Sequence, residues 1–210
     1  MNINNTTLRL TDGCYFPEKI AKSLVLMHFT AGTTAKGAVD YWKILKNGIS
    51  APYVVDTDGT IYETYNPEFW SYHLGFKGTH AHDKRSVAIE VVNPGPLVLT
   101  GDTLYFWPKN FKEKYCMASE TNRYVNSTLY RGYSHFAAFT KAQMDVIPTL
   151  VQNICDRFKI PYEAIEDPLT FQPDYASRFN GIVSHSNFRA DKYDVGPAFD
   201  WSVFSKKVVS

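Results

Sequence analysis

Short apolar runs alternate along the chain with longer stretches whose apolar residues follow a helical period. Residues 23–28 form a compact apolar run that ends at His28, and residues 86–92 form a second run. A third run, residues 181–185, ends at His185. Each has the length and composition of a buried strand. We therefore predict three buried strands, two of which close with a histidine before a polar loop.

Two stretches have the spacing of amphipathic helices. Thr34 is a suitable N-cap for the first, in which the apolar residues are Ala35, Ala38, Val39, Trp42 and Leu45. Thr140 and Gln143 have the spacing of a capping box ahead of a second apolar stripe over residues 144–158. Residues 197–206 predict a closing helix that buries Phe199, Trp201 and Phe204.

The rest of the chain divides into a hairpin and a segment without a clear period. Residues 53–55 and 60–62 flank the turn sequence 56–59, which contains a glycine and predicts a hairpin. In residues 97–139, aromatic residues are scattered among Gly, Asn, Lys and Glu, so we expect an irregular excursion from the core. Strands that alternate with long helices indicate an α/β protein. We predict a single domain, residues 1–210, with one central sheet and a core over about 23–204.

Composition narrows the class of partner. The 22 Lys and Arg residues nearly balance the 21 Asp and Glu residues, so no charge surplus favours nucleic acid or an acidic membrane as a ligand. The hydrophobic fraction of 44% is enough for a substantial core in one domain. The cysteines, Cys14, Cys116 and Cys155, are odd in number and far apart. This pattern favours buried thiols over a disulfide framework or a paired-cysteine zinc site.

The N-terminal segment lacks the features of a targeting signal. Residues 1–12 are polar and contain neither a basic patch nor an apolar stretch, and residues 23–27 are too few to span a bilayer. We therefore expect no membrane insertion and a monomer that is cytoplasmic as synthesised. A route to an extracytoplasmic substrate would have to come from a partner protein or from a cleaved signal.

The two histidines at strand ends suggest a metal site. Taken alone, each of His28 and His185 is more commonly a buried or surface imidazole than a ligand. Neighbouring strands of one sheet, however, would bring their ends to a common edge. Asp194 follows in the polar turn 192–197, which can fold its carboxylate back toward that edge. Two imidazoles and one carboxylate are a sufficient ligand set for Zn²⁺, with a fourth position left for water.

Several spaced segments resemble a known family. They appear in the order expected of the N-acetylmuramoyl-L-alanine amidase type 2 family, which includes T7-type phage lysozyme, muropeptide-recycling amidases and peptidoglycan-recognition proteins. The segments are 28–32, 50–51 ahead of 58–60, 70–75, 86–90, 184–186 and 192–201. The resemblance implies a mixed central β-sheet flanked by helices, with a zinc groove on one side. It also implies hydrolysis of the amide between N-acetylmuramic acid and L-alanine, with peptidoglycan or a muropeptide as substrate.

The resemblance assigns roles to individual residues. His28, His185 and Asp194 match the zinc ligands. Glu90 matches the catalytic glutamate of the recycling branch. The tyrosine that other branches supply is replaced here by Ala51, which favours Glu90 as the acid/base. If Glu90 were not the acid/base, Tyr53 would be the next candidate.

The match assigns four more residues, and it also has departures. Lys192 matches the basic residue that polarises the scissile carbonyl. His73, Trp70 and Thr30 lie in matched segments and are expected to contact substrate. Asn187 and Val195 depart from the family pattern, in which an aspartate and a proline are common at these positions. The path of this loop is therefore open at this stage.

Two biological settings and two rival functions remain. A phage-type endolysin and a cytoplasmic recycling amidase both fit a chain without a signal, and the aromatic excursion at 97–139 favours the broader groove of an endolysin. A non-catalytic peptidoglycan-binding protein is disfavoured because every ligand and acid/base position is filled. An endopeptidase that cuts within the peptide stem would keep the zinc and change the bond.

Overall fold

The protein is described by a computed structural model that covers residues 2–75, 79–106 and 110–205. Its main sheet has six strands within these ranges, in the order β1-β4-β3-β5-β2-β11. The strands are β1 (Ile3–Asn4), β2 (Leu24–Phe29), β3 (Tyr53–Val55), β4 (Ile61–Glu63), β5 (Ser86–Val91) and β11 (Gly181–Ser184). The helices are α1 (Ala35–Leu45), α2 (Ala81–Arg85), α3 (Lys141–Phe158), α4 (Pro173–Arg178), α5 (His185–Phe188) and the 3₁₀ turn η1 (Trp201–Phe204).

The main sheet is mixed, as the resemblance implies. Strands β3, β5, β2 and β11 run parallel, whereas β4 is antiparallel to β3 and β1 is parallel to β4. In the register of the sheet His28 pairs with Glu90, and Ser184 pairs with Met27. The carboxyl ends of β2, β5 and β11 therefore meet at one edge, which brings His28, Glu90 and His185 together.

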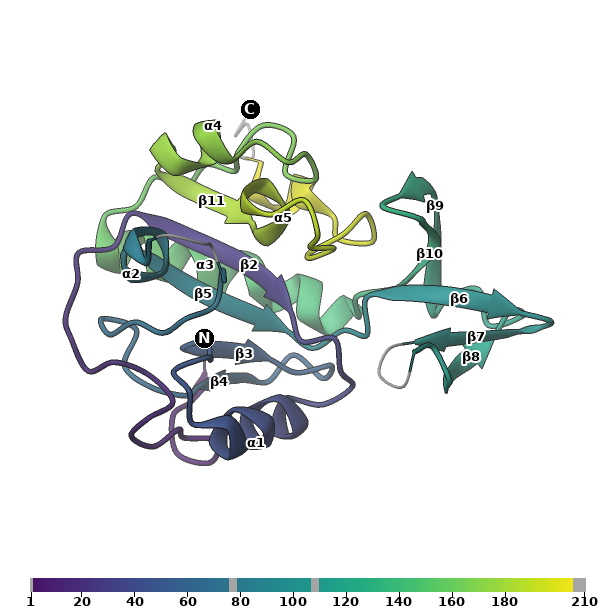
Figure 1. Ribbon diagram of the computed structural model, residues 1–210, viewed down its shortest axis with the longest axis horizontal. Helices are drawn as coiled ribbons and strands as arrows, with labels where there is room; N and C mark the ends of the chain where they lie inside the picture. The colour runs from purple at the N-terminus through teal and green to yellow at the C-terminus, as the bar shows by residue number, and fades with distance from the viewer. Residues whose placement is uncertain (1, 76–78, 107–109, 206–210) are drawn as a thin grey trace.

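Helices cover both faces of this sheet (Figure 1). Val25 and Met27 of β2 belong to a core with residues of α3, whereas Leu24 and Leu26 belong to a core on the other face with residues of α4 and α5. Helix α1 packs on the same side as that second core, over β3 and β5. Since side chains alternate along a strand, His28 points to the face that carries Leu24 and Leu26. The mixed α/β fold with flanking helices is confirmed.

Both long helices begin at the predicted caps. The Thr34 hydroxyl accepts a hydrogen bond from the Gly37 amide at the start of α1. Thr140 and Gln143 form the complete capping box at the start of α3. The hairpin of β3 and β4 is also present.

The expectation of an irregular excursion at 97–139 is wrong. This segment forms most of a second sheet, here called the insertion sheet, with antiparallel strands in the order β8-β7-β6-β10-β9. The strands are β6 (Pro96–Thr100), β7 (Thr103–Phe106), β8 (Glu113–Met117), β9 (Tyr124–Tyr130) and β10 (Tyr133–Ala137). Register shifts between Leu104 and Tyr105, and between Tyr133 and His135, interrupt the period of two that would have marked these strands in the sequence.

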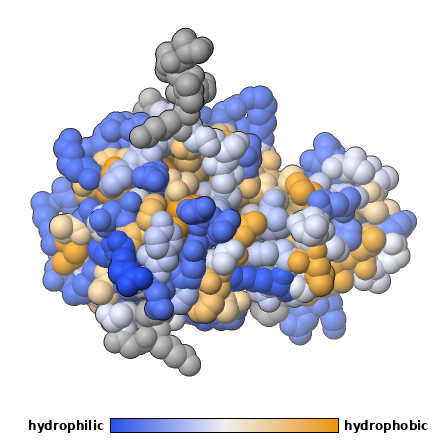
Figure 2. Space-filling model, turned by 90° about the horizontal axis from the view of Figure 1, so that it is seen from above, coloured by the Kyte–Doolittle hydropathy of each residue, from blue (hydrophilic) through white to orange (hydrophobic). Residues whose placement is uncertain are grey.

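The insertion sheet projects from one side of the main sheet (Figure 1). Its small core consists of Leu97, Leu104, Phe106, Cys116 and Ala137. It also carries exposed apolar side chains such as Leu99 and Leu129, and apolar surface is visible on this part of the molecule in Figure 2. A layer of this kind has only one well-packed face, so its sequence is less apolar than that of the main sheet.

The closing helix is shorter than predicted. Only the single turn η1 forms, and Lys206 lies outside the described residues. Phe199 and Phe204 are nonetheless buried, and Trp201 packs against both rings. One turn is enough to bring these rings together, so burial did not require a longer helix.

Two further observations concern the whole described chain. The thiols of Cys14, Cys116 and Cys155 are free and buried, as expected. Among the described residues, every helix is too short or too polar to cross a bilayer.

Candidate metal centre and active site

The predicted ligands converge at the common edge of β2 and β11. His28 lies near the end of β2, and His185 is the first residue of α5, one position later than the strand end expected from the sequence. Asp194 lies in the loop that follows. One ligand atom from each residue lies within 4.8 Å of the other two. Asp194 Oδ2 is 2.9 Å from His28 Nδ1 and 2.9 Å from His185 Nδ1.

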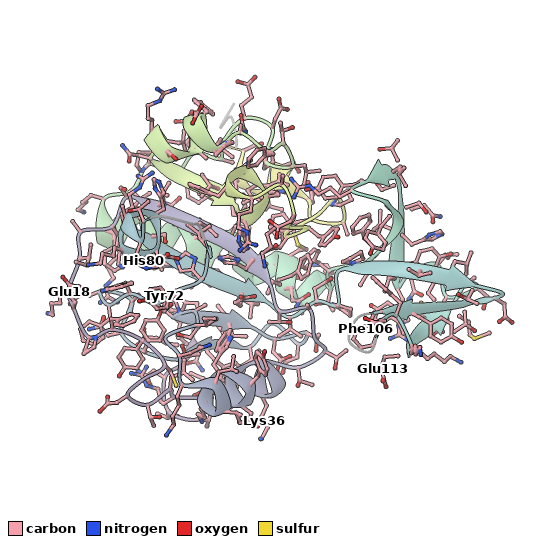
Figure 3. The ribbon with its side chains drawn as sticks, viewed as in Figure 1. Glu18, Lys36, Tyr72, His80, Phe106 and Glu113 are labelled. Carbon is pink, nitrogen blue, oxygen red and sulfur yellow. The ribbon has the colours of Figure 1, made fainter. Side chains whose placement is uncertain are left out.

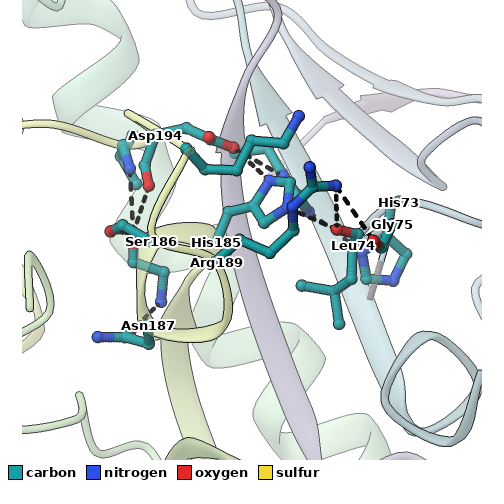
Figure 4. Close-up of polar contacts among 12 residues, drawn as sticks. His73, Leu74, Gly75, His185, Ser186, Asn187, Arg189 and Asp194 are labelled. Carbon is teal, nitrogen blue, oxygen red and sulfur yellow. Dashed lines mark hydrogen bonds and ion pairs between the residues drawn. The ribbon is translucent and has the colours of Figure 1, made fainter. Parts of the chain in front are cut away.

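His185 is held from its other side by the backbone (Figure 4). Its Nε2 is 2.8 Å from the carbonyl oxygen of Leu74. A carbonyl oxygen only accepts hydrogen bonds, so Nε2 carries a proton, and the nitrogen available as a metal ligand is Nδ1, which faces Asp194. Arg189 donates to the carbonyls of both Leu74 and Gly75, at 3.3 and 3.1 Å, and thereby fixes this stretch of backbone.

His28 is held by a chain of side chains. The Ser86 hydroxyl donates to the His82 carbonyl at 2.8 Å, so its oxygen accepts from His73 Nε2, also at 2.8 Å. Burial lowers the pKa of His73 to about 3, which keeps that ring neutral with Nδ1 as an acceptor. His28 Nε2, 3.1 Å away, is the donor to that atom. The Nδ1 atom of the neutral His28 ring then directs its lone pair at Asp194.

The charges at this centre follow from burial and contact. Burial lowers the pKa of His28 to about 4. Burial acts to raise the pKa of Asp194, but without a metal the positive charge of His185 and hydrogen bonds from His185 and His28 outweigh burial and hold the pKa well below its usual range. A cation bound between the three atoms would supply that positive charge in place of the protons on the two Nδ1 atoms. The exposed fractions of His28, His185 and Asp194 are 2%, 3% and 7%. The centre therefore combines a buried carboxylate with imidazole lone pairs.

A cavity of about 500 Å³ opens beside these residues. Glu90 and Lys192 both line it, together with the three converging residues. Glu90 Oε2 is enclosed and has no hydrogen-bond partner among the described residues. Burial, followed by the charge of Asp194, raises the pKa of Glu90 to about 8, while Lys192 acts in the opposite direction. The cavity thus brings a proton-carrying group and a cation to the same place.

The residues expected to contact substrate are less uniform. His73 lines the cavity, but both of its ring nitrogens already have protein partners, Ser86 and His28. Trp70 and Thr30 do not line it. The Thr30 hydroxyl accepts from the Gly32 amide at 3.3 Å.

Trp70 belongs to an aromatic cluster. Its ring stacks on Phe16 at 4.2 Å between centroids, and its indole nitrogen donates to Glu18 at 2.9 Å. Tyr72 and His80 are members of the same cluster, which is distant from the insertion sheet (Figure 3). The structure therefore gives Trp70 a packing role, and a substrate contact for it stays a prediction.

The alternative acid/base is on the wrong face. Tyr53 belongs to the core beneath α3, and its hydroxyl is 3.4 Å from Glu63. It pairs with Ile89 in the register, so its side chain points away from the face that carries Glu90. Among Glu90 and Tyr53, only Glu90 reaches the cavity.

The two departures from the family pattern are accommodated by this chain. Asn187 Oδ1 accepts from the Ser184 amide at 2.8 Å, and its Nδ2 donates to the Thr170 carbonyl at 2.9 Å. An aspartate could accept the first of these hydrogen bonds, but it has no N–H group to donate the second. Val195 is 2% exposed and packs in the main core. Both residues support the loop that carries Asp194.

Other functional residues were not singled out from the sequence. Ser86 is one, because its role depends on a histidine thirteen positions away. Arg131 is another: it lies in the turn between β9 and β10 and donates to the carbonyls of Ser186 at 3.2 Å, Arg189 at 3.0 Å and Lys192. The pair Arg131-Gly132 is typical of a turn, but nothing in the local sequence indicates where that turn docks.

Comparison with protein families and solved structures places the chain. The family model described as N-acetylmuramoyl-L-alanine amidase (Amidase_2) matches residues 18–197. The chain belongs to this amidase family. Comparison with curated protein sequences gave no match. Among solved structures, 24 chains are similar to this family member.

Three of these structures illustrate the similarity. The amidase AmiD from E. coli, in complex with anhydro-N-acetylmuramic acid-L-Ala-D-gamma-Glu-L-Lys, has a TM-score of 0.54 and 18% identity over 90% of this chain, which spans 58% of the AmiD chain. The amidase LysC from Clostridium intestinale has a TM-score of 0.54 and 11% identity, with coverage of 97% and 95%. AmpDh3 from Pseudomonas aeruginosa, in complex with anhydromuramic pentapeptide, has a TM-score of 0.51 and 16% identity, with coverage of 97% and 65%. At these identities the similarity establishes the amidase fold.

Proposed function

We propose that this protein is a zinc-dependent N-acetylmuramoyl-L-alanine amidase that hydrolyses the amide between N-acetylmuramic acid and L-alanine in peptidoglycan. The observation that carries the proposal is that three electron-donating atoms, two imidazole nitrogens and one carboxylate oxygen, face one another. The lone pairs of His28 Nδ1 and His185 Nδ1 both face Asp194 Oδ2 at 2.9 Å. Because the ring protons are committed to other partners on the far side, this arrangement calls for a cation between the three atoms.

The donor set fits zinc. Two neutral imidazoles and one carboxylate are a common ligand set for catalytic Zn²⁺, and the partners behind His28 and His185 fix which ring nitrogen is available. When bound, zinc would act as a Lewis acid and lower the pKa of a water molecule. A proton could also bridge the three atoms, but the pKa of about 4 at His28 makes protonation of that ring unfavourable at neutral pH.

Glu90 is suited to move the proton. Hydrolysis of an amide joins a water oxygen to the carbonyl carbon, breaks the carbon–nitrogen bond and transfers a water proton to the departing nitrogen. A carboxyl group with a pKa of about 8 exchanges its proton near neutral pH, so its ionised form can accept the water proton and its protonated form can then give that proton to the nitrogen. Its Oε2 has no hydrogen-bond partner among the described residues, so no protein contact must be broken for it to act.

Lys192 is suited to stabilise the oxyanion. Negative charge develops on the carbonyl oxygen as water adds, and a fixed cation near that oxygen lowers the barrier. Lys192 lines the same cavity as Glu90. Arg131 and the amide hydrogen bond of Lys192 to the Arg189 carbonyl, at 3.3 Å, both hold its backbone. We assign the oxyanion role to its ammonium group.

Support for the substrate comes from the family and from two solved relatives. AmiD and AmpDh3 were each solved with an anhydromuramic peptide bound. We extend that substrate class to this chain as a proposal. The setting we favour is a phage-type endolysin that acts on intact wall, with recycling of soluble anhydromuropeptides as the alternative.

Mass spectrometry of digested peptidoglycan tests the reaction. Stem-free glycan strands together with intact stem peptides are the expected products. Shortened peptides would instead reveal an endopeptidase, and unchanged material would indicate a binding protein. Parallel digestion of intact sacculi and of soluble anhydromuropeptides separates the two settings, because an endolysin is expected to release products from sacculi.

A further inference from the structure

The insertion sheet is anchored to the loop that carries the proposed active-site residues. Arg131, in the turn between β9 and β10, donates to three backbone carbonyls of the segment 186–192. Next to it, the Tyr130 hydroxyl donates to the Leu169 carbonyl at 3.1 Å. These contacts set the position of β10 relative to Lys192 and Asp194. The insertion sheet is therefore part of the site.

The first residue of β10 joins an aromatic wall, defined here as Tyr133, Tyr193 and Phe111. The Tyr133 ring lies 5.4 Å from the Tyr193 ring, nearly perpendicular to it, and 5.3 Å from the Phe111 ring. All three residues line the cavity that also contains His28 and Glu90, and all three are partly exposed. Phe111 adopts a φ of 59°, a conformation that bulky residues rarely adopt. The wall thus borders the cavity that contains the proposed reaction centre.

The chemistry of the wall suits a sugar ring. It offers aromatic carbon surface and two phenolic hydroxyl groups and carries no charge, which matches a pyranose with its C–H faces and hydroxyl groups. A peptide stem rich in carboxylate and ammonium groups would gain little from such a surface. Tyr193 stands between Lys192 and Asp194 in the chain, so the wall begins beside the point where the scissile amide would lie.

We propose that the aromatic wall is a glycan subsite that binds the pyranose ring adjacent to the scissile amide. The inference rests on the proposed function, since it takes the sugar to be that of a muramoyl peptide. Tyr133 is the central contact, because its ring touches both of the other rings. Arg131 keeps Tyr133 and Tyr193 together through its bonds to the loop.

The test uses a ligand that has the sugar and lacks the scissile bond. The N-acetylglucosaminyl-N-acetylmuramic acid disaccharide, without a peptide, is titrated against the intact protein by NMR or calorimetry. Tyr133→Ala is expected to weaken its binding by about 10-fold, whereas Tyr133→Phe retains most of the affinity. Tyr133→Leu is expected to behave like Tyr133→Ala, because it keeps apolar volume and loses the ring.

Tyr105→Ala is the matched control. Tyr105 lies on β7 of the same sheet, is partly exposed and does not line the cavity. This variant is expected to bind the disaccharide as the parent does. Equal losses in Tyr105→Ala and Tyr133→Ala would overturn the proposal, because they would trace the effect to the sheet as a whole. Far-UV circular dichroism and zinc content, unchanged in Tyr133→Phe and Tyr133→Leu, show that the fold and the metal site are intact.

Kinetics and a second ligand complete the test. With a muropeptide substrate, Tyr133→Ala is expected to raise KM by about 10-fold and leave kcat nearly unchanged.

If a free stem peptide loses affinity in Tyr133→Ala and the disaccharide does not, the wall binds peptide and the proposal is wrong. An active parent with no Tyr133 effect refutes the subsite alone. Disaccharide binding that depends on Tyr133 in a protein without hydrolytic activity refutes the proposed function and leaves the subsite standing.

Discussion

The main sheet and the insertion sheet are built on different principles. In the main sheet, strands such as β2 and β5 are buried on both faces, and apart from Ser86 at the start of β5 their polar side chains lie where the strands reach the site, as with His28 and Glu90. In the insertion sheet, strands such as β9 are largely exposed, and the packed core is small. The first sheet fixes the groups proposed to carry out the chemistry, and the second supplies a wall beside them. Substitutions should therefore affect turnover in the first and substrate affinity in the second.

The largest effect is expected from loss of a proposed ligand at the carboxyl edge of the main sheet. His28→Ala and His185→Ala should each abolish activity and lose stoichiometric zinc, because alanine supplies no ligand atom in place of the imidazole. Metal analysis of the purified variants measures this directly. Removal of metal by a chelator should likewise stop turnover while the far-UV circular dichroism persists, since the cores on the two faces of the main sheet are built mainly from apolar residues and do not require the metal. Variants that hold as much zinc as the parent would refute the ligand assignment.

A smaller effect is expected at Glu90. Glu90→Gln preserves shape and removes the proton carrier, so kcat should fall by about 10² or more while zinc content and substrate affinity are kept. Zinc content, binding and kcat are best measured on one preparation. Full activity would remove Glu90 from the mechanism, and Tyr53 could not replace it because that side chain lies beneath α3.

The chain of contacts behind His28 should affect metal affinity more than fold. Ser86→Ala removes the acceptor for His73 Nε2 and so loosens the orientation of His28. We expect zinc affinity to fall by about 10- to 100-fold, as is typical when an outer partner of a ligand is lost. Competition with a chelator of known affinity measures it, and ¹⁵N NMR of the imidazoles reports the tautomer of His28 in the metal-free protein.

His80→Ala is the control for that experiment. His80 is exposed, and its Nδ1 is 3.4 Å from Asp83 in the same region of the chain. Unchanged affinity in His80→Ala and reduced affinity in Ser86→Ala would assign the effect to the contact with His73. If Ser86→Ala binds zinc as tightly as the parent, the proposed orientation of His28 does not depend on this chain.

The smallest effect concerns the pH dependence of stability at Lys22, two residues before β2. Lys22 is 6% exposed, and its ammonium donates to the carbonyls of Phe69 and Lys84, each at 2.7 Å. Burial lowers its pKa from 10.5 to about 8. Between these values the unfolded chain binds more protons than the folded chain, so the free energy of unfolding rises with pH. Below pH 8 both states are protonated and the cost of burial is constant.

Lys22→Met removes this pH dependence. The parent should gain stability relative to the variant between pH 8 and 10.5, by an amount on the order of 1–3 kcal/mol. Urea unfolding at several pH values measures the difference, which isolates Lys22 from other groups that titrate in the same range. Parallel pH profiles for the two proteins would contradict the lowered pKa.

The main sheet was largely predictable from the sequence, and the insertion sheet was not. Apolar runs marked β2, β5 and β11, their ends suggested that His28, His185 and Asp194 meet, and the family resemblance matched the same three residues to metal ligands. The period of β7 and β10 is broken by register shifts, so the pattern of apolar residues does not predict strands there. In an exposed antiparallel layer, neighbouring strands determine each residue's environment, and a single sequence does not reveal that pairing.

The supporting contacts of the site were also beyond local patterns. The bonds of His73 to Ser86 and His28 join three segments of the main-sheet region, and their direction follows from burial and from available acceptors. The role of Arg131 depends on where a turn docks. Such features follow from packing between distant segments, which the sequence specifies only through the complete fold.

The contacts of Arg131 link two equilibria. One guanidinium joins the turn between β9 and β10 to the carbonyls of Ser186, Arg189 and Lys192, so ordering of the loop and ordering of the turn share part of their free energy. A cation held by His185 and Asp194 would stabilise that loop and, by linkage through Arg131, the turn between β9 and β10, which is far from the loop in the sequence. Amide hydrogen exchange in β9 and β10 should consequently slow when metal is added, although no ligand lies in either strand.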